Sequence, residues 1–242
     1  MSSAPFQALI MAGGKGTRLL PYTTVLPKPL MPLGDASVLE HLLCLLRRHQ
    51  VRRVCLAVNH LRHLIQALFG DGHALGMEIT YAVEDEPLGT CGLLAQVIDE
   101  MEERFLLLNG DLVTDMDMEA LIAHHAESGA AASVAALRYG AQLEYGVLDV
   151  TDQGQITRIR EKPRTEYLIN MGVYALTRAC VRPYLPLGQR LDMPELLQAL
   201  VAAGHDVRAY EAECAWLDIG RPEDFVKAQA LVQGLSEAAT RP

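Results

Sequence analysis

Short apolar runs alternate with amphipathic segments through the first half of the chain. Aliphatic and β-branched runs predict strands near residues 7–12, 53–58, 78–83 and 104–109. Between them, apolar residues at helical spacing predict helices over about 37–49, 92–102 and 117–127. This alternation predicts an α/β fold, with a Rossmann-like, doubly wound, mostly parallel sheet flanked by helices.

The pattern changes after about residue 131. The segments there read as strands joined by turns, and helices return near 192–203 and 222–234. The strand-like segments are ASVAALRY, YGVLDV, GQITRIRE and YLINMGVYAL. We therefore predict one domain over residues 1–242, with a mixed sheet and a β-rich inset in its second half.

Composition excludes several classes of protein. The net charge of −9 argues against a nucleic-acid groove, which needs a basic field. The longest apolar runs are shorter than the roughly 20 residues of a membrane span, and the N-terminus lacks a signal-like pattern, so a cytoplasmic protein is expected. Five scattered cysteines without a CxxC pair predict neither a disulfide framework nor a zinc site. The pairs His60/His63 and His124/His125 lack a third ligand and are expected on helix surfaces.

A glycine-rich stretch follows the first predicted strand, since residues 8–21 read ALIMAGGKGTRLLP. Glycines there let backbone N–H groups point at phosphate oxygens without interference from a Cβ atom. The stretch lacks the GxxxxGK[ST] pattern of a P-loop, and Leu19 stands where GxGxxG needs its third glycine. It therefore predicts phosphate binding of another kind, with a structural turn as the alternative.

Lysine is rare in this chain, which makes its positions informative. The lysines are Lys15, Lys28, Lys162 and Lys227. Lys28 stands in LPKPLMP, where three prolines restrict the backbone and the directions open to the side chain. An ammonium group held in this way suits a phosphate better than a mobile surface lysine would.

These motifs together resemble a known signature. GGKGTRLLPYTTVLPKPLMP (13–32) is similar to the pattern GGxGTRLxPxTxxxPKPxxP of the sugar-1-phosphate nucleotidyltransferases. Further motifs of that family follow in order: EDEPLGTCG, LLLNGDL, EYGVLDV, REKP, INMGVYAL and WLDIGRPEDF. The short length, the LDMP segment (191–194) and WLDIGRPEDF most resemble small bacterial guanylyltransferases. Those enzymes activate heptose, mannose or glucosamine phosphates for cell-envelope and surface glycans such as lipopolysaccharide or capsule.

The resemblance implies that a sugar-1-phosphate oxygen attacks the α-phosphorus of a nucleoside triphosphate and that pyrophosphate leaves. It implies a nucleotide-binding half over about 1–130 and a sugar-binding half over about 131–242. Such a reaction needs positioning and charge neutralisation more than a protein nucleophile. Arg18 would bind the pyrophosphate and Lys28 would bridge the two substrates, whereas the role of Lys15 stays open. The implied nucleotide-binding set is Ala12, Gly13, Gly14, Gly16, Thr17, Arg18, Glu84, Pro87, Gly89, Thr90, Asn109 and Gly110.

Two carboxylates are the implied ligands of a Mg²⁺ ion. Asp111 follows a predicted strand, at the edge where open α/β sheets bind ligands. The resemblance pairs it with Asp218, and oxygen ligands are those that Mg²⁺ prefers. Capping or turn roles are the alternatives for both residues. Asp115 and Asp117 form a second candidate metal motif, unless Asp117 opens the helix over 117–127.

Sugar and base recognition are less specified. By resemblance the sugar-phosphate site contains Lys28, Gly146, Glu161, Lys162 and Asn170, with a solvated hairpin end as the alternative for Glu161 and Lys162. A carboxylate can accept hydrogen bonds from both N1–H and the 2-amino group of guanine, whereas uracil and thymine favour an amide. Glu84 and its acidic neighbours therefore favour GTP, unless the backbone of Leu88 and Gly89 reads the base.

Several alternatives stay open. The same reaction could use UTP, dTTP or CTP, or the chain could be a metal-dependent glycosyltransferase that uses Asp115 and Asp117. A non-catalytic regulator that binds an NDP-sugar is a third reading. The presence together of Arg18, Lys28, Asp111 and Asp218 counts against it. The predicted partners are a nucleoside triphosphate and a sugar-1-phosphate, without nucleic acid or membrane, and a homodimer is left open.

Overall fold

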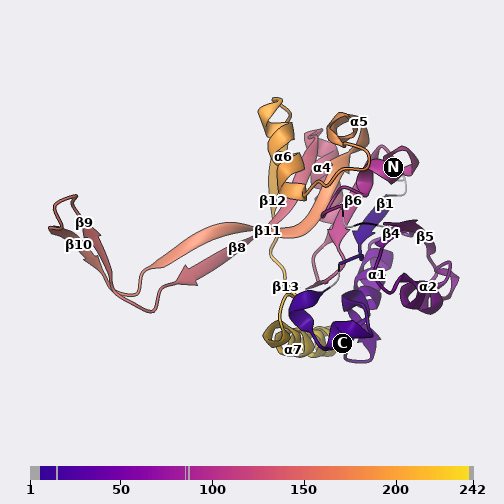
Figure 1. The fold of residues 1–242 in the computed structure, drawn as a ribbon, viewed down its shortest axis with the longest axis horizontal. Coiled ribbons are helices and arrows are strands. Elements are labelled where there is room, and N and C mark those ends of the chain that lie inside the picture. Colours follow the sequence, from indigo (N-terminus) through magenta and orange to yellow (C-terminus); the bar gives the residue numbers. More distant parts are fainter. Residues whose placement is uncertain (1–5, 15, 85, 87, 240–242) are drawn as a thin grey trace.

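A seven-stranded sheet forms the centre of the molecule, in the order β12-β8-β11-β6-β1-β4-β5 (Figure 1). The structure is a computed structural model that describes residues 6–14, 16–84, 86 and 88–239. The four strands predicted in the first half are β1 (Gln7–Met11), β4 (Arg53–Val58), β5 (Glu78–Val83) and β6 (Arg104–Asn109). The others are β8 (Ala132–Gln142), β11 (Arg164–Thr177) and β12 (Val207–Glu211).

The sheet is parallel except for β11, which runs antiparallel to both β6 and β8. The chain passes from β1 outward to β4 and β5, and then crosses to the other side of β1 to form β6. The carboxyl ends of β1 and β6 therefore flank a topological switch point, where open α/β sheets bind ligands. The predicted doubly wound, mostly parallel sheet is confirmed.

Helices cover both faces of the sheet, because successive strand residues point to opposite sides. On one face, Ile10 and Leu106 belong to a core shared with α1 (Val38–Arg48), α2 (Arg62–Phe69) and α4 (Met118–Ser128). On the other face, Leu9 and Phe105 belong to a core shared with α3 (Leu94–Val97), α5 (Arg178–Val181) and α6 (Met193–Ala202). Burial on both sides explains why these strands are apolar runs rather than alternating patterns.

A third, smaller core lies beneath the loops that follow β1 and β6. It joins two short strand pairs to the C-terminal helix. The pairs are β2 (Pro32–Leu33) with β3 (Ala36–Ser37), and β7 (Leu112–Thr114) with β13 (Trp216–Asp218), and the helix is α7 (Pro222–Ala239).

The β-rich inset is a long arm. β8 and β11 continue as a two-stranded ribbon beyond the central sheet, and β9 (Val147–Val150) pairs with β10 (Ile156–Arg160) at the far end (Figure 1). The predicted turn at 151–154 closes this terminal hairpin, where the Gly154 N–H donates to the Thr151 carbonyl over 2.8 Å.

Most predicted elements are present, with one correction. The helix expected over 92–102 is broken into α3 and a 3₁₀ turn at Ile98–Glu100. Gly92 precedes this helix and is pressed against the backbone, since an added Cβ would lie 2.2 Å from the Leu88 carbonyl oxygen. The sequence pattern missed α2, α5, β2, β3, β7, β12 and β13. The remaining 3₁₀ helices are Thr17–Leu19, Tyr22–Thr24, Lys28–Leu30, His73–Leu75 and Arg182–Tyr184.

The expectation that His125 lies on a helix surface is wrong. Its side chain is fully buried, and its two ring nitrogens lie 2.9 Å from Ser133 Oγ and 3.0 Å from Thr177 Oγ1. It thus ties α4 to β8 and β11. Burial, with smaller contributions from Arg104 and His124, lowers the pKa of His125 from 6.5 to about 4.

This buried histidine predicts an acid-sensitive fold. Between pH 6.5 and about 4 the unfolded chain binds a proton at this residue that the folded chain does not, so stability falls as pH falls. The expected loss is on the order of 2–3 kcal/mol. Urea unfolding of the wild type and of His125→Gln at both pH values should show a steeper loss for the wild type. Equal losses would contradict the prediction.

Candidate active site

The glycine loop and the Asp111 loop lie against each other at the switch point. Met11 and Asn109 are register partners at the ends of β1 and β6. Directly after β6, the Gly110 N–H donates to the Met11 carbonyl over 3.0 Å. A Cβ on Gly110 would lie 2.7 Å from the same oxygen, so glycine is required for this approach.

The glycine loop is tied to the lysine segment by Gly16. This residue has a φ of +58°, and an added Cβ would lie 2.8 Å from Thr23 Cγ2 and 3.1 Å from Lys28 Cβ. The buried Thr23 hydroxyl donates to the Gly16 carbonyl over 2.9 Å. The two motifs therefore form one unit, and Gly14 within it is exposed. Lys15 lies outside the described residues.

Lys28 joins the two predicted carboxylates. Its Nζ forms a short ion pair with Asp111 Oδ2 and lies 3.9 Å from Asp218 Oδ1. The Lys28 side chain is 12% exposed, against 26% for Asp111 and 48% for Asp218, so the ammonium is largely enclosed and the carboxylates face solvent. Residues far apart in the sequence thus form one charged cluster.

The antiparallel pairing of β7 with β13 brings these carboxylates together. Asp218 is the register partner of Leu112, and the Ile219 N–H donates to the Asp111 carbonyl over 3.1 Å. The third core fixes the same segments from below. An apolar neighbour of each charged residue is buried in it: Leu19 beside Arg18, Met31 near Lys28, Val113 near Asp111 and Ile219 beside Asp218.

The electrostatics of the cluster favour an added cation. Burial and then the charge of Asp111 raise the pKa of Asp218, while Lys28 and Arg18 lower it. Arg18 is exposed, and its Nη1 lies 3.6 Å from where a Cβ on Gly220 would be. The partly buried carboxylates of Asp111 and Asp218 therefore share the single ammonium of Lys28, and the exposed Arg18 lies beside them.

The base-loop carboxylate has a structural role. Glu84 directly follows β5 and is buried, and its Oε1 accepts a hydrogen bond from the Leu88 N–H over 2.7 Å. Its Oε2 lies 3.6 Å from where a Cβ on Gly13 would be. One of the two carboxylate oxygens is therefore already engaged with the loop, which weakens the case for bidentate pairing with guanine. Pro87 lies outside the described residues.

Gly89 and Thr90 are held by the segment before α6. A Cβ on Gly89, whose φ is +87°, would lie 2.6 Å from the Leu191 carbonyl oxygen. Asp192 Oδ1 accepts from the Thr90 N–H over 2.8 Å, and the Thr90 hydroxyl accepts from the Met193 N–H over 2.8 Å. The Thr90 side chain thus positions the loop.

Two residues of this region were not identified from the sequence. Asn59 directly follows β4 and its Cβ lies 3.2 Å from where a Cβ on Gly13 would be, so it lines the glycine loop. Its position directly after a predicted strand could have identified it as a candidate ligand-binding residue, because ligands bind at the carboxyl ends of such strands. Asp192, by contrast, acts through a contact to Thr90 that no local pattern indicates.

Comparison with known proteins gives the family. A sequence profile described as "Nucleotidyl transferase" matches residues 7–234. The chain belongs to this nucleotidyl transferase family. It is 32% identical to a mannose-1-phosphate guanylyltransferase of Mycobacterium tuberculosis, over 98% of this chain and 67% of the relative. It is 33% identical to a UTP–glucose-1-phosphate uridylyltransferase of Synechocystis, over 92% of this chain and 62% of the relative. The chain therefore spans about two thirds of the length of these relatives.

Solved structures share the fold of this nucleotidyl transferase. HddC from Yersinia pseudotuberculosis, complexed with GMP-PN, superposes with a TM-score of 0.74 at 24% identity, covering 94% of this chain and 99% of that one. A glucose-1-phosphate thymidylyltransferase of Bacillus anthracis, described as putative and bound to sucrose, gives a TM-score of 0.75 at 21% identity, with 93% and 94% covered.

The donor set of the nucleotidyl transferase fits a divalent cation. Asp111, in the turn just before β7, and Asp218, at the end of β13, both supply carboxylate oxygens, and their mutual repulsion would be relieved by a cation between them. Across the described residues, no group of three or more His, Cys, Asp or Glu side chains is arranged so that it could hold a metal ion. Mg²⁺ commonly takes one or two carboxylates and completes its shell with phosphate oxygens and water.

The predicted sugar-side residues are not brought to this cluster. Gly146 directly precedes β9, and Glu161 and Lys162 directly follow β10, so all three lie at the base of the terminal hairpin, which Figure 1 shows far from the central sheet. There Lys162 Nζ is 4.0 Å from Glu144 Oε2, and Glu161 Oε2 is 3.1 Å from where a Cβ on Gly146 would be. In this structure the β8–β11 ladder carries these residues outward, so their part in a sugar pocket stays a prediction.

Asn170 lies at the root of the arm and shapes the backbone. Its Oδ1 accepts from the Gly172 N–H and its Nδ2 donates to the Tyr174 hydroxyl, both over 2.8 Å. These bonds hold the register shift between β11 and β8. Gly172, with a φ of +74°, leaves room for Asn109, whose Nδ2 would be 2.5 Å from an added Cβ.

Asp115 and Asp117 have structural roles instead of forming a metal motif. Asp115 Oδ1 accepts from the Ala215 N–H over 2.7 Å. Asp117 caps α4, where its Oδ1 accepts from the Ala120 N–H over 3.0 Å. The prediction that Asp117 opens this helix is confirmed.

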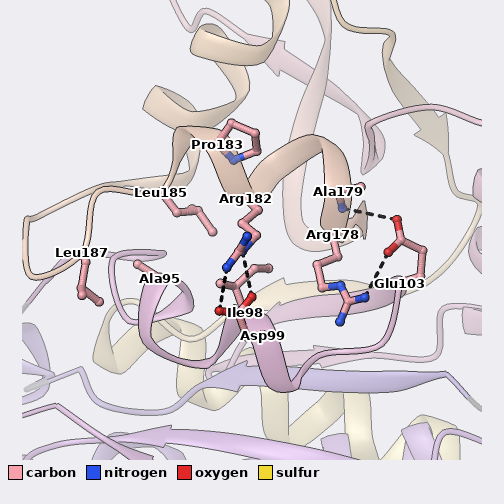
Figure 2. A pocket seen from close by; sticks show the side chains of 10 residues that line it. All are labelled: Ala95, Ile98, Asp99, Glu103, Arg178, Ala179, Arg182, Pro183, Leu185 and Leu187. Atoms are coloured by element: carbon pink, nitrogen blue, oxygen red, sulfur yellow. Dashed lines mark hydrogen bonds and ion pairs between the residues drawn. The ribbon is translucent and has the colours of Figure 1, made fainter.

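A hollow of about 750 Å³ lies between the α3 region and α5 (Figure 2). Arg182 pairs there with Asp99 over 2.8 Å, and Arg178 lies 3.4 Å from Glu103. Because both arginines face carboxylates, this hollow is poorly suited to phosphate.

Within the described residues, none of the helices combines the length and hydropathy that crossing a membrane requires.

Proposed function

We propose that this protein transfers a nucleoside monophosphate from a nucleoside triphosphate to a sugar-1-phosphate and releases pyrophosphate. The observation that carries the proposal is the cluster of Lys28, Asp111 and Asp218 beside the glycine loop at the switch point. Most of the relatives and structures compared act on sugar-1-phosphates by name, and they differ in the nucleotide.

The residues would act by position and charge. The exposed loop around Gly14 offers backbone N–H groups to the triphosphate, and the Arg18 guanidinium suits the departing pyrophosphate. The Lys28 ammonium, held beside Asp111 and Asp218, would bind phosphate oxygens of both substrates. Little covalent chemistry is left for the protein, because the sugar phosphate itself is the nucleophile.

Mg²⁺ is the proposed cofactor, held by Asp111 and Asp218. When bound it would neutralise charge on the phosphate oxygens that surround the α-phosphorus. The raised pKa of Asp218 implies that binding competes with a proton, so metal affinity would weaken as pH falls. We also propose a cytoplasmic role in making nucleotide sugars for cell-envelope glycans such as lipopolysaccharide or capsule.

The experiment that tests the proposal is a pyrophosphate-release assay with Mg²⁺. It crosses ATP, CTP, GTP, UTP and dTTP with a panel that includes mannose, glucose, glucosamine and heptose 1-phosphates. Release that requires both substrates supports the transferase. Absence of release with every pair would refute it and would favour the regulator, which should still bind an NDP-sugar in calorimetry.

GTP is the proposed nucleotide, with UTP, dTTP and CTP as alternatives. Glu84→Gln tests it, because the amide oxygen can still accept from the Leu88 N–H while the carboxylate charge is lost. We expect kcat/KM for GTP to fall at least about 10-fold relative to that for UTP, the value of one charged hydrogen bond. The exposed Glu86→Gln is the matched control. Unchanged selectivity in both variants would mean that the loop backbone reads the base.

A glycosyltransferase that uses Asp115 and Asp117 is the second candidate. Its metal motif is occupied by structural hydrogen bonds to Ala215 and Ala120. Hydrolysis or transfer from an NDP-sugar, without pyrophosphate release, would favour it.

A further inference from the structure

The arm, defined here as residues 137–169, exposes an unusual amount of apolar surface for a two-stranded ribbon. Figure 1 shows it extending from the central sheet, and within the described residues β9 and β10 pair only with each other. Its large apolar side chains are between 49% and 81% exposed: Tyr139, Leu143, Tyr145, Leu148, Val150, Ile156, Ile159, Tyr167 and Leu168.

The strand register divides the proximal ribbon into two faces. Cross-strand partners share a face, so Leu137 and Ile169 lie with Tyr139 and Tyr167 on one side. Leu137 packs against the main core, which makes this apolar face a continuation of that core. The opposite face is mainly polar apart from Leu168, and Arg138, the register partner of Leu168, pairs there with Glu211 over 2.7 Å and lies 3.7 Å from Glu166.

The distal hairpin repeats this division. Leu148 pairs with Ile159 and Val150 with Ile156, which places all four on one face. Asp149 and Arg160 lie on the other face and form an ion pair of 2.8 Å. An isolated two-stranded ribbon is at best marginally stable in water, so the apolar face needs a covering layer.

We propose that a second copy of this chain covers the arm, and that the arms of the two copies are exchanged. At roughly 100 Å² for each half-exposed large side chain, the apolar residues offer about the 800 Å² per partner that a stable interface buries. The arm cannot turn back onto its own body without breaking its ladder, which runs continuously from Asn170 to Arg164 along β11.

Charge also favours a second copy. The arm carries five basic and five acidic residues and is formally neutral, so the rest of the chain carries the whole net charge of −9. Two acidic bodies repel each other, whereas a neutral, tyrosine-bearing arm can approach an acidic body without this cost. The exchange is isologous, because each copy gives an arm and receives one.

The exchange also resolves the separation of the site residues. This step rests on the proposed function: each copy's Lys28 and Asp111 would meet Glu161 and Lys162 of the other copy. A sugar-phosphate site would then be complete only in the dimer.

The first experiment measures assembly by sedimentation equilibrium. The wild type is expected to be a dimer, and Tyr139→Ser/Tyr167→Ser is expected to raise the dimer Kd at least about 10²-fold, as loss of two interface tyrosines can. Gln142→Ser/Arg164→Ser, the register partners on the polar face, is the matched control and should stay dimeric. A monomeric wild type, or a dimer unaffected by the tyrosine changes, would overturn the proposal. These sedimentation results test the dimer whether or not the protein catalyses the proposed reaction.

The second experiment mixes two inactive variants, Lys28→Ala and Lys162→Ala. After dissociation and reassociation, mixed dimers would contain one intact site each, because body and arm come from different copies. Activity is expected to return to about one quarter of the wild-type rate, since half of randomly assorted dimers are mixed. A dimeric mixture without activity would overturn the exchange. Full activity of Lys162→Ala alone would refute only the sugar-side role, and the sedimentation result would then decide the interface.

Discussion

Lys28→Ala is expected to lower kcat at least about 10²-fold without unfolding the protein, as loss of a central electrostatic group commonly does. Its ammonium forms an ion pair with Asp111, lies 3.9 Å from Asp218 and is mostly enclosed. Without it the two carboxylates repel each other, and the incoming phosphates lose a cation held by the adjacent prolines. The effect should appear in kcat more than in KM, because the group acts where charge accumulates.

The pH profile adds a readout that simple loss of structure would not produce. The charge of Lys28 lowers the pKa of Asp218 against burial and Asp111, so removing it raises that pKa further. The acidic limb of the residual activity should therefore move to higher pH. Lys227→Ala is the matched control, since Lys227 is exposed and lies 4.0 Å from Asp224. A near-normal rate, or an unmoved acidic limb, would mean that Lys28 is not at the reacting centre.

The sequence predicted the sheet because its strands are buried on both faces. Ile10 and Leu106 pack on one side and Leu9 and Phe105 on the other, so uninterrupted apolar runs were the signal. β7 and β13 were missed because each is short and gains its pairing partner from residues about a hundred positions away. Yet this pair places Asp218 beside Asp111, so the assembly of the site was predictable only through the family resemblance.

The sugar-side residues show the opposite limit. Their motifs were recognisable in order along the chain, but no local pattern indicates how far β8 and β11 carry them from the sheet. The ladder is regular from Ala136 to Gln142, and β9 of the terminal hairpin begins a few residues beyond the end of β8. Glu84 shows a further limit of sequence-based prediction. Its carboxylate is buried directly after β5, where base recognition was predicted, but in the structure it accepts a hydrogen bond from the Leu88 N–H. Residue type predicted its location but not its hydrogen-bond partner.

Asp111→Asn is expected to lower kcat/KM at least about 10²-fold and to raise the Mg²⁺ concentration needed for half-maximal activity. The substitution keeps the shape of the side chain, so the fold should persist. It removes one of two adjacent negative charges, which weakens a divalent cation site. It also lowers the pKa of Asp218, since the charge of Asp111 raises that pKa. The remaining activity should therefore extend to lower pH, opposite in direction to the shift expected for Lys28→Ala.

Asp115→Asn is the matched control for this substitution. Asp115 lies in the same region and is exposed, and an amide oxygen can still accept the hydrogen bond from the Ala215 N–H. Its kcat and Mg²⁺ dependence should stay within about 3-fold of the wild type, since the change removes no group of the cluster. If Asp115→Asn instead abolished activity while Asp111→Asn retained it, the metal would lie at the Asp115 and Asp117 motif. Each variant removes one negative charge, and which of the two abolishes activity distinguishes the nucleotidyl transferase reaction from the glycosyltransferase alternative.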